Sequence, residues 1–157
     1  MTLIFWLSAL VAVAATVMVI TRTNAMHALL YLITSLLAVA VIFYALGAPF
    51  VAALEVIVYA GAIMVLFLFV VMMLNLGPHS VPEERQWFTP RLLIGPGVLG
   101  LILLAETAYA LFARRAPLSP VEVPPQQVGA ALYGPYLLGV ELSSLLLLAG
   151  LVGAYHL

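Results

Sequence analysis

Three glutamates lie inside long apolar stretches of this 157-residue sequence, and they are the side chains best able to do chemistry there: Glu55, Glu106 and Glu141. An ionised side chain at the centre of a lipid bilayer costs about 2.5–3.5 kcal/mol on insertion scales, so each carboxyl group needs a partner, water or a proton. Proton transfer and polar contact between helices are the two roles that this setting offers. Both roles stay open for all three residues, and Glu106 could equally face a polar pocket of a partner chain.

The segment around Glu55 carries two further features. Tyr59 lies four residues later, on the same face of a helix, and Gly61 follows in Tyr59-Ala60-Gly61-Ala62. Glycine inside a helix costs about 1 kcal/mol relative to alanine and permits a local change of hydrogen-bond register such as a π-bulge. A carboxyl group, a phenol and a flexible backbone point in one helix favour a proton-conducting or gated segment. The structural alternative is close helix packing at the glycine and a simple hydrogen bond from Glu55 to a neighbouring chain.

The composition places these residues in a membrane. Charged residues make up 7% of the sequence, whereas a water-soluble domain has about a quarter. Hydrophobic residues make up 66%, and the mean hydropathy is +1.26. A soluble globular enzyme is therefore excluded. The absence of cysteine excludes disulfides and cysteine-ligated iron–sulfur clusters, and a net charge of −1 without a basic cluster excludes nucleic acid as a partner.

Five apolar runs are each long enough to cross the ~30 Å hydrocarbon core of a bilayer as a helix. We therefore predict an all-α polytopic fold and a single transmembrane domain over residues 1–157, with the lipid bilayer as its surroundings. The predicted helices cover residues 2–21, 25–46, 50–76, 91–113 and 135–157.

Local signals set the ends of these helices. Asn24 is a candidate N-cap of the second helix, Gly47-Ala48-Pro49 predicts a turn, and Pro49 fits the first turn of the third helix. Polar loops are expected at 77–90 and 114–134. The prolines of the second loop predict that it is extended and non-helical: Pro117, Pro120, Pro124 and Pro125.

The arginines give the orientation. Arg22, Arg85 and Arg91 lie on one side of the predicted topology, and Arg114 and Arg115 lie on the other. Because cytoplasmic loops carry the excess of basic residues, this distribution narrowly favours a periplasmic N-terminus and a cytoplasmic C-terminus.

The third predicted helix carries the most specific pattern. The stretch from Leu54 to Leu76, LEVIVYAGAIMVLFLFVVMMLNL, resembles the signature of the subunit J family of the bacterial proton-pumping NADH:quinone oxidoreductase, respiratory complex I. The mitochondrial counterpart of that family is NADH dehydrogenase chain 6. Further matches lie at 23–32, 84–87 and 134–142. Glu106 does not match the family pattern.

The resemblance implies a membrane-arm core subunit of that complex in the bacterial cytoplasmic (inner) membrane. Subunits A, H, K and N are its expected neighbours. The resemblance implies no cofactor in this chain, because FMN, the iron–sulfur clusters and NADH belong to partner subunits and quinone binds in a neighbouring one. The chain is thus expected to be a subunit of an enzyme without redox chemistry of its own.

The resemblance also implies that the third helix switches between α and π forms near Tyr59 and Gly61. Such a switch opens or closes a water-filled proton path and so couples quinone reduction to proton translocation. In this hypothesis Gly61 is the pivot, Val65 is the apolar gate and Tyr59 bonds at the bulge. Glu55 is a polar contact or proton relay, and Glu141 is a further candidate on the proton path.

Three other functions compete with this hypothesis. The chain is a purely structural linker of the membrane arm in the first, and an independent small proton or cation channel in the second. In the third it is a haem-binding membrane anchor, for which His27, His79 and His156 are the only candidate histidine ligands.

Overall fold

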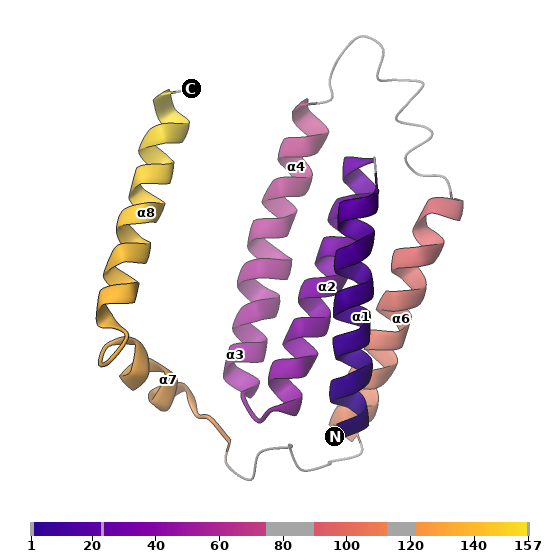
Figure 1. Cartoon of the computed structure of the whole chain (residues 1–157), viewed down its shortest axis with the longest axis horizontal. Coiled ribbons are helices and arrows are strands. Elements are labelled where there is room, and N and C mark those ends of the chain that lie inside the picture. Colours follow the sequence, from indigo (N-terminus) through magenta and orange to yellow (C-terminus); the bar gives the residue numbers. More distant parts are fainter. Residues whose placement is uncertain (1, 23, 75–89, 113–121, 157) are drawn as a thin grey trace. The chain divides into compact units, whose positions relative to one another are not determined.

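The computed structural model describes residues 2–22, 24–74, 90–112 and 122–156. These residues form helices and no strand (Figure 1), which confirms the predicted all-α fold. They fall into two units, Met1–Glu122 and Val123–Leu157. The description of 1–157 as one transmembrane domain stays a prediction.

The helices follow the predicted order. The first unit contains α1 (Thr2–Thr21), α2 (Ala25–Ala45), α3 (Pro49–Leu54), the π-helix η1 (Glu55–Ile63), α4 (Met64–Leu74) and α6 (Pro90–Phe112). The second unit contains α7 (Pro125–Leu132) and α8 (Leu137–His156).

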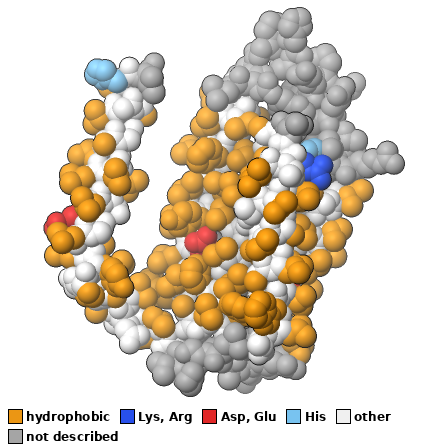
Figure 2. All heavy atoms as spheres, viewed as in Figure 1, with side chains coloured by type: hydrophobic (Ala, Val, Ile, Leu, Met, Phe, Trp, Pro, Cys, Tyr) orange, Lys and Arg blue, Asp and Glu red, His pale blue; other side chains and the backbone are white. Residues whose placement is uncertain are grey.

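Five helices of the described residues are long and apolar enough to cross a membrane, with α3, η1 and α4 forming one continuous span. This agrees with the five predicted spans. Figure 2 shows hydrophobic side chains over the described helices and acidic side chains only as isolated spots. Such a surface suits hydrocarbon and not water.

The local signals at the second and third helices are confirmed. The Asn24 side chain caps α2 by accepting hydrogen bonds from the backbone N–H groups of Met26, at 2.9 Å, and His27, at 3.3 Å. Gly47 turns the chain with a φ of 87°, and Pro49 occupies the first turn of α3.

The conformation of Gly47 leads to a prediction about stability. We expect Gly47→Ala to lower the free energy of unfolding by about 1–2 kcal/mol, because a side chain in the left-handed region meets the backbone. The measurement is the thermal unfolding midpoint of the purified protein in detergent. Gly47→Asn is the control, since asparagine tolerates this region better. An alanine variant as stable as the wild type would contradict the assignment.

Helix α2 is the centre of the first unit, because it packs against α1, α3, η1, α4 and α6. Small residues allow α1 and α2 to approach closely; Ala15 and Ala38 are both fully buried. Hydroxyl groups also join these two helices. Thr16 and Ser35 share a hydrogen bond of 2.9 Å between their side-chain oxygens, and the Ser35 Oγ donates to the Ala12 carbonyl oxygen at 3.1 Å.

The buried core of this unit lies between α1, α2 and α6. We call it the core cluster, and it consists of Ile4, Val11, Ala38, Val41, Leu103 and Ala110. The π-helix contributes no buried residue. The third membrane helix therefore borders the core cluster without belonging to it.

The second unit corrects the predicted extended segment over 114–134. Residues 125–132 of that segment form α7. Pro124 is its extended N-cap and Pro125 its first residue, a position where the missing N–H costs nothing and the fixed φ already suits a helix. The proline pair therefore starts a helix here. The α8 helix then has no buried residue.

Some predictions fall outside the described residues. The polar loop at 77–90 lies almost wholly in 75–89, and the second loop lies partly in 113–121. Because Arg85, Arg114 and Arg115 belong to these segments, the orientation of the termini stays a prediction.

Candidate functional site

The third membrane helix is α-helical at both ends and π-helical in the middle. At Glu55 the backbone N–H still bonds the Val51 carbonyl oxygen, four residues earlier. At Met64 the backbone N–H donates to the Tyr59 carbonyl oxygen, five residues earlier, which is the register of a π-helix. Residues Glu55–Ile63 form this segment. The predicted π-bulge in the third helix is confirmed.

Gly61 is suited to this register because of its missing side chain. A Cβ atom at this position would lie 3.1 Å from the Val56 carbonyl oxygen, five residues earlier. That distance is shorter than ordinary van der Waals contact, and the obstructing atom belongs to the backbone. A side chain at position 61 therefore requires the Val56 carbonyl oxygen to shift by a few tenths of an ångström, and glycine avoids that shift.

Two other predicted residues of this helix, Tyr59 and Val65, are exposed on the first unit. Tyr59 is 50% exposed and Val65 is 45% exposed, while Glu55 and Gly61 are half-buried. Within the described part of the chain, the side chains of Glu55 and Tyr59 make no hydrogen bond. Both polar groups are thus available to lipid headgroups, water or a neighbouring chain.

Glu141 belongs to the other unit. It lies on α8 with its side chain exposed, and its backbone carbonyl oxygen accepts a hydrogen bond of 2.7 Å from Ser144 Oγ. Its role on a proton path stays a prediction.

The sequence reasoning missed the partner of Glu106. The Ser8 Oγ on α1 donates to the Glu106 Oε2 on α6 at 2.7 Å, and both side chains are buried. Glu106 therefore does not face a partner chain, one of the options that the sequence left open. Ser8 is the one polar residue between Leu3 and Ala15. That was the available signal, although nothing in the sequence indicates that α1 and α6 are neighbours.

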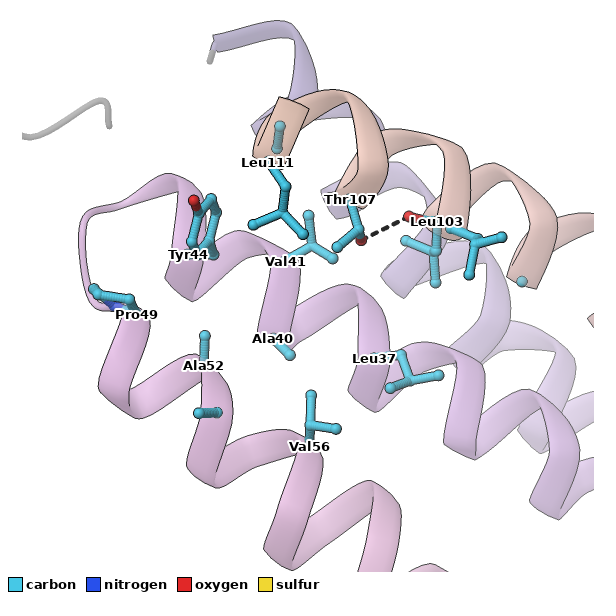
Figure 3. Close-up of a pocket in the computed structure, with 14 residues that line it drawn as sticks. Leu37, Ala40, Val41, Tyr44, Pro49, Ala52, Val56, Leu103, Thr107 and Leu111 are labelled. Atoms are coloured by element: carbon cyan, nitrogen blue, oxygen red, sulfur yellow. Dashed lines mark hydrogen bonds between the residues drawn. The ribbon is translucent and has the colours of Figure 1, made fainter. Parts of the chain in front are cut away.

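An apolar cavity of about 410 Å³ lies beside the π-helix, between α2, α3 and α6 (Figure 3). Val56 of η1 forms part of its wall. Thr107 is one of its few polar residues, and its Oγ1 donates to the Leu103 carbonyl oxygen at 2.7 Å. The lining residues come from α2, α3, η1 and α6: Leu37, Ala40, Val41, Tyr44, Pro49, Ala52, Ala53, Val56, Gly100, Leu103, Leu104, Thr107, Ala110 and Leu111.

Comparisons with known proteins agree with the motif in the third helix. Residues 15–157 match the family model described as NADH-ubiquinone/plastoquinone oxidoreductase chain 6. A Pseudomonas aeruginosa protein named NADH-quinone oxidoreductase subunit J is 60% identical over 156 residues, which is 98% of this chain and 93% of the relative. The Escherichia coli K12 protein of that name is 54% identical over 97% of this chain and 83% of its own length.

A more distant protein of the same name, from Rhodobacter capsulatus, is 38% identical over 96% of this chain and 77% of its own length. These three relatives are aligned over 96–98% of this chain, and the family model covers the whole π-helical segment. The chain belongs to the NADH-ubiquinone/plastoquinone oxidoreductase chain 6 family, which includes the bacterial subunit J proteins.

Proposed function

We propose that this chain is a membrane-arm core subunit of a proton-pumping NADH:quinone oxidoreductase, respiratory complex I, in the bacterial cytoplasmic membrane. The family match, the subunit J relatives and the five apolar helices support this. Subunits A, H, K and N are its proposed neighbours. NADH, FMN, the iron–sulfur clusters and quinone are bound by other subunits in this proposal, so this chain contributes no redox chemistry. Its N-terminus is periplasmic and its C-terminus cytoplasmic.

The chain's specific contribution is a switch in the third helix. The π-helix over Glu55–Ile63 is the observation that carries this proposal. In the alternative state the same residues pair four apart, as in an α-helix. The π segment holds one more residue than an α segment of the same length. When it becomes α-helical, that extra residue turns α4 relative to α3 by about 100°. The two-state element is therefore a short stretch of backbone whose hydrogen bonds have two registers.

Rotation of α4 changes which side chains line the path beside it. Val65 lies one turn beyond Gly61 and is half exposed. Rotation of α4 therefore moves the Val65 side chain toward or away from the neighbouring subunit or water path beside this helix. An apolar constriction blocks ions and protons by excluding water. When the Val65 side chain points into the proton path, the path contains no water and protons cannot cross. When rotation of α4 moves Val65 out, water fills the path, so the helix register controls proton flow. In this proposal the Tyr59 hydroxyl, which has no hydrogen-bond partner among the described residues, bonds a neighbouring group at the bulge, and Glu55 and Glu141 are the polar groups along the path.

The structural linker is the second candidate. The side chains of Glu55 and Tyr59, which make no hydrogen bond among the described residues, favour it, because such groups also hold a neighbouring helix in place by hydrogen bonds. Both candidates need Glu55 to contact another group. They differ in whether Glu55 must carry a proton.

A pair of substitutions at Glu55 separates these roles. We expect Glu55→Gln to lower NADH-driven proton uptake by inverted membrane vesicles, and Glu55→Ala to lower it further, because glutamine keeps the hydrogen bond but carries no exchangeable acid proton. The measurement is protons taken up per NADH oxidised. Glu122→Gln is the matched control, because that glutamate is exposed and lies outside the membrane helices, and it should leave proton uptake unchanged. Wild-type uptake in the glutamine variant together with loss in the alanine variant would make Glu55 a hydrogen-bond partner only.

A further inference from the structure

Helix α8 uses its whole length to cross the membrane. It contains 20 residues, Leu137–His156, which extend over about 30 Å at 1.5 Å per residue. The hydrocarbon core of a bilayer is also ~30 Å thick. The first residue of α8 therefore lies at the boundary between the hydrocarbon and the headgroups, and the residues just before it lie at the level of the headgroups.

Helix α7 is tied directly to that boundary. The Tyr136 backbone N–H donates to the Ala131 carbonyl oxygen at 3.2 Å, and the Leu137 backbone N–H donates to the Gly134 carbonyl oxygen, also at 3.2 Å. These bonds join the last turn of α7 to the first residue of α8, so the chain between them has no slack. Because α7 also runs across the direction of α8 (Figure 1), it stays near the membrane surface.

The corner between the two helices has no room for a side chain at Gly134. A Cβ atom there would lie 2.7 Å from the Ala130 carbonyl oxygen, closer than Cβ atoms approach a backbone oxygen in real proteins. The direction of α7 relative to α8 therefore depends on this glycine. Gly139, on α8, differs in this respect, because a Cβ atom on it meets nothing within 4 Å.

The side chains of α7 divide into an apolar and a polar side. At about 100° per residue, Val128 and Leu132 lie on one side of the helix, and Gln126 and Gln127 lie on the other. No residue of α7 is buried, and Leu132 is 44% exposed. An amphipathic helix at a membrane surface lies in the plane of the interface and turns its apolar side toward the acyl chains.

The residues around the corner favour lipid over a protein partner. Tyr133 and Tyr136 are 74% and 66% exposed, and tyrosine is enriched where a membrane meets water. Residues 123–136 contain no Asp, Glu, Lys, Arg or His, so this surface offers no ion pair to a partner chain or to an anionic headgroup. Apolar contact and neutral hydrogen bonds are what it offers, and an uncharged lipid surface supplies both.

We propose that α7 and the Tyr133–Tyr136 corner form an interfacial anchor that binds the lipid surface of the bilayer. Val128 and Leu132 contact the acyl chains, and the two tyrosines lie among the headgroups. Gln126 and Gln127 face headgroups and water. The anchor sets the depth at which α8 enters the membrane. The proposal rests on α8 being a membrane span and not on the α/π switch.

The test is photocrosslinking in the complete complex. The photoreactive residue p-benzoylphenylalanine replaces Leu132, membranes that contain the assembled complex are irradiated, and the mass of this chain is measured after purification. We expect an adduct with one phospholipid. The matched control carries the same photoreactive residue in place of Gln127, on the opposite side of α7, and should lose this adduct.

Two further measurements examine the corner and the role of charge. Combined with the probe at Leu132, Gly134→Ala should lower the yield of the lipid adduct, because the new Cβ forces the corner open, and Gly139→Ala should leave the yield unchanged. After reconstitution of the purified complex in phosphatidylcholine vesicles, the yield should be the same with and without phosphatidylglycerol, because residues 123–136 carry no cation.

A crosslink from position 132 to another subunit would overturn the proposal, and so would an assembled complex without a lipid adduct. Equal lipid adducts from positions 132 and 127 would also overturn it, because α7 would then have no fixed side toward the bilayer. If the probe at Leu132 prevents assembly, the same residue in place of Val128 must give the lipid adduct, and its absence there counts against the anchor equally.

Discussion

Gly61→Val is expected to cause a severe loss of proton pumping per NADH oxidised, with electron transfer to quinone continuing. In the π register the new Cβ would lie 3.1 Å from the Val56 carbonyl oxygen, and the two branching methyl groups add further bulk. Overpacking of this kind costs about 1–3 kcal/mol, and a bias of that size shifts a two-state equilibrium by roughly 5- to 150-fold. The helix would then stay in the α form.

The measurement compares proton uptake with NADH oxidation in the same inverted vesicles. Gly97→Val is the control, because a Cβ atom on Gly97 meets nothing within 4 Å. Gly61→Ala should give an intermediate loss, since it adds the obstructing Cβ without the branch. A fully assembled Gly61→Val complex with the wild-type ratio of protons to NADH would exclude Gly61 as the pivot.

The membrane helices were predictable from the sequence because the bilayer makes a uniform demand on them. Any segment that crosses hydrocarbon must be apolar over about 20 residues, so the five spans follow from hydropathy alone. The ends of the helices follow from residues with strong local preferences, such as Asn24 at an N-cap and Gly47 at a positive φ.

The π-helix was predictable only in part. The glycine at position 61 indicated that the helix can change its hydrogen-bond register. The prediction of a π-bulge at that place came from the resemblance to a known family. The reason is that the close approach of residue 61 to the Val56 carbonyl oxygen exists only once the π register has formed. No pattern of apolar residues encodes that contact directly.

The contact between Ser8 and Glu106 was not predictable, because it depends on which helices are neighbours. Hydropathy places each helix in the membrane but leaves its rotation and its neighbours open. The α7 helix was missed for a different reason. Prolines usually end helices, but a proline at the first helical position starts one, and the pair Pro124-Pro125 fits both interpretations.

Deletion of Ala60 is expected to abolish most proton pumping while the complex still assembles. A π segment accommodates one more residue than an α segment between the same two ends. Removing one residue from Glu55–Ile63 lets the backbone pair four apart throughout, with α3 and α4 keeping their present faces. Contacts with neighbouring chains are then preserved, but the second register is lost. Assembly is measured by native gel electrophoresis, and pumping by proton uptake per NADH oxidised.

A deletion in the α-helical part provides the control. Removing Val70 from α4 leaves the π-helix intact and rotates the residues that follow by about 100°, so this variant should assemble poorly. The two deletions thus have opposite expected effects on assembly. If the chain is only a structural linker, it needs only the helix faces that contact its neighbours. This hypothesis predicts wild-type pumping after deletion of Ala60. A register switch predicts a well-assembled complex that oxidises NADH and moves few protons, because the faces are retained and only the alternative hydrogen bonds are gone.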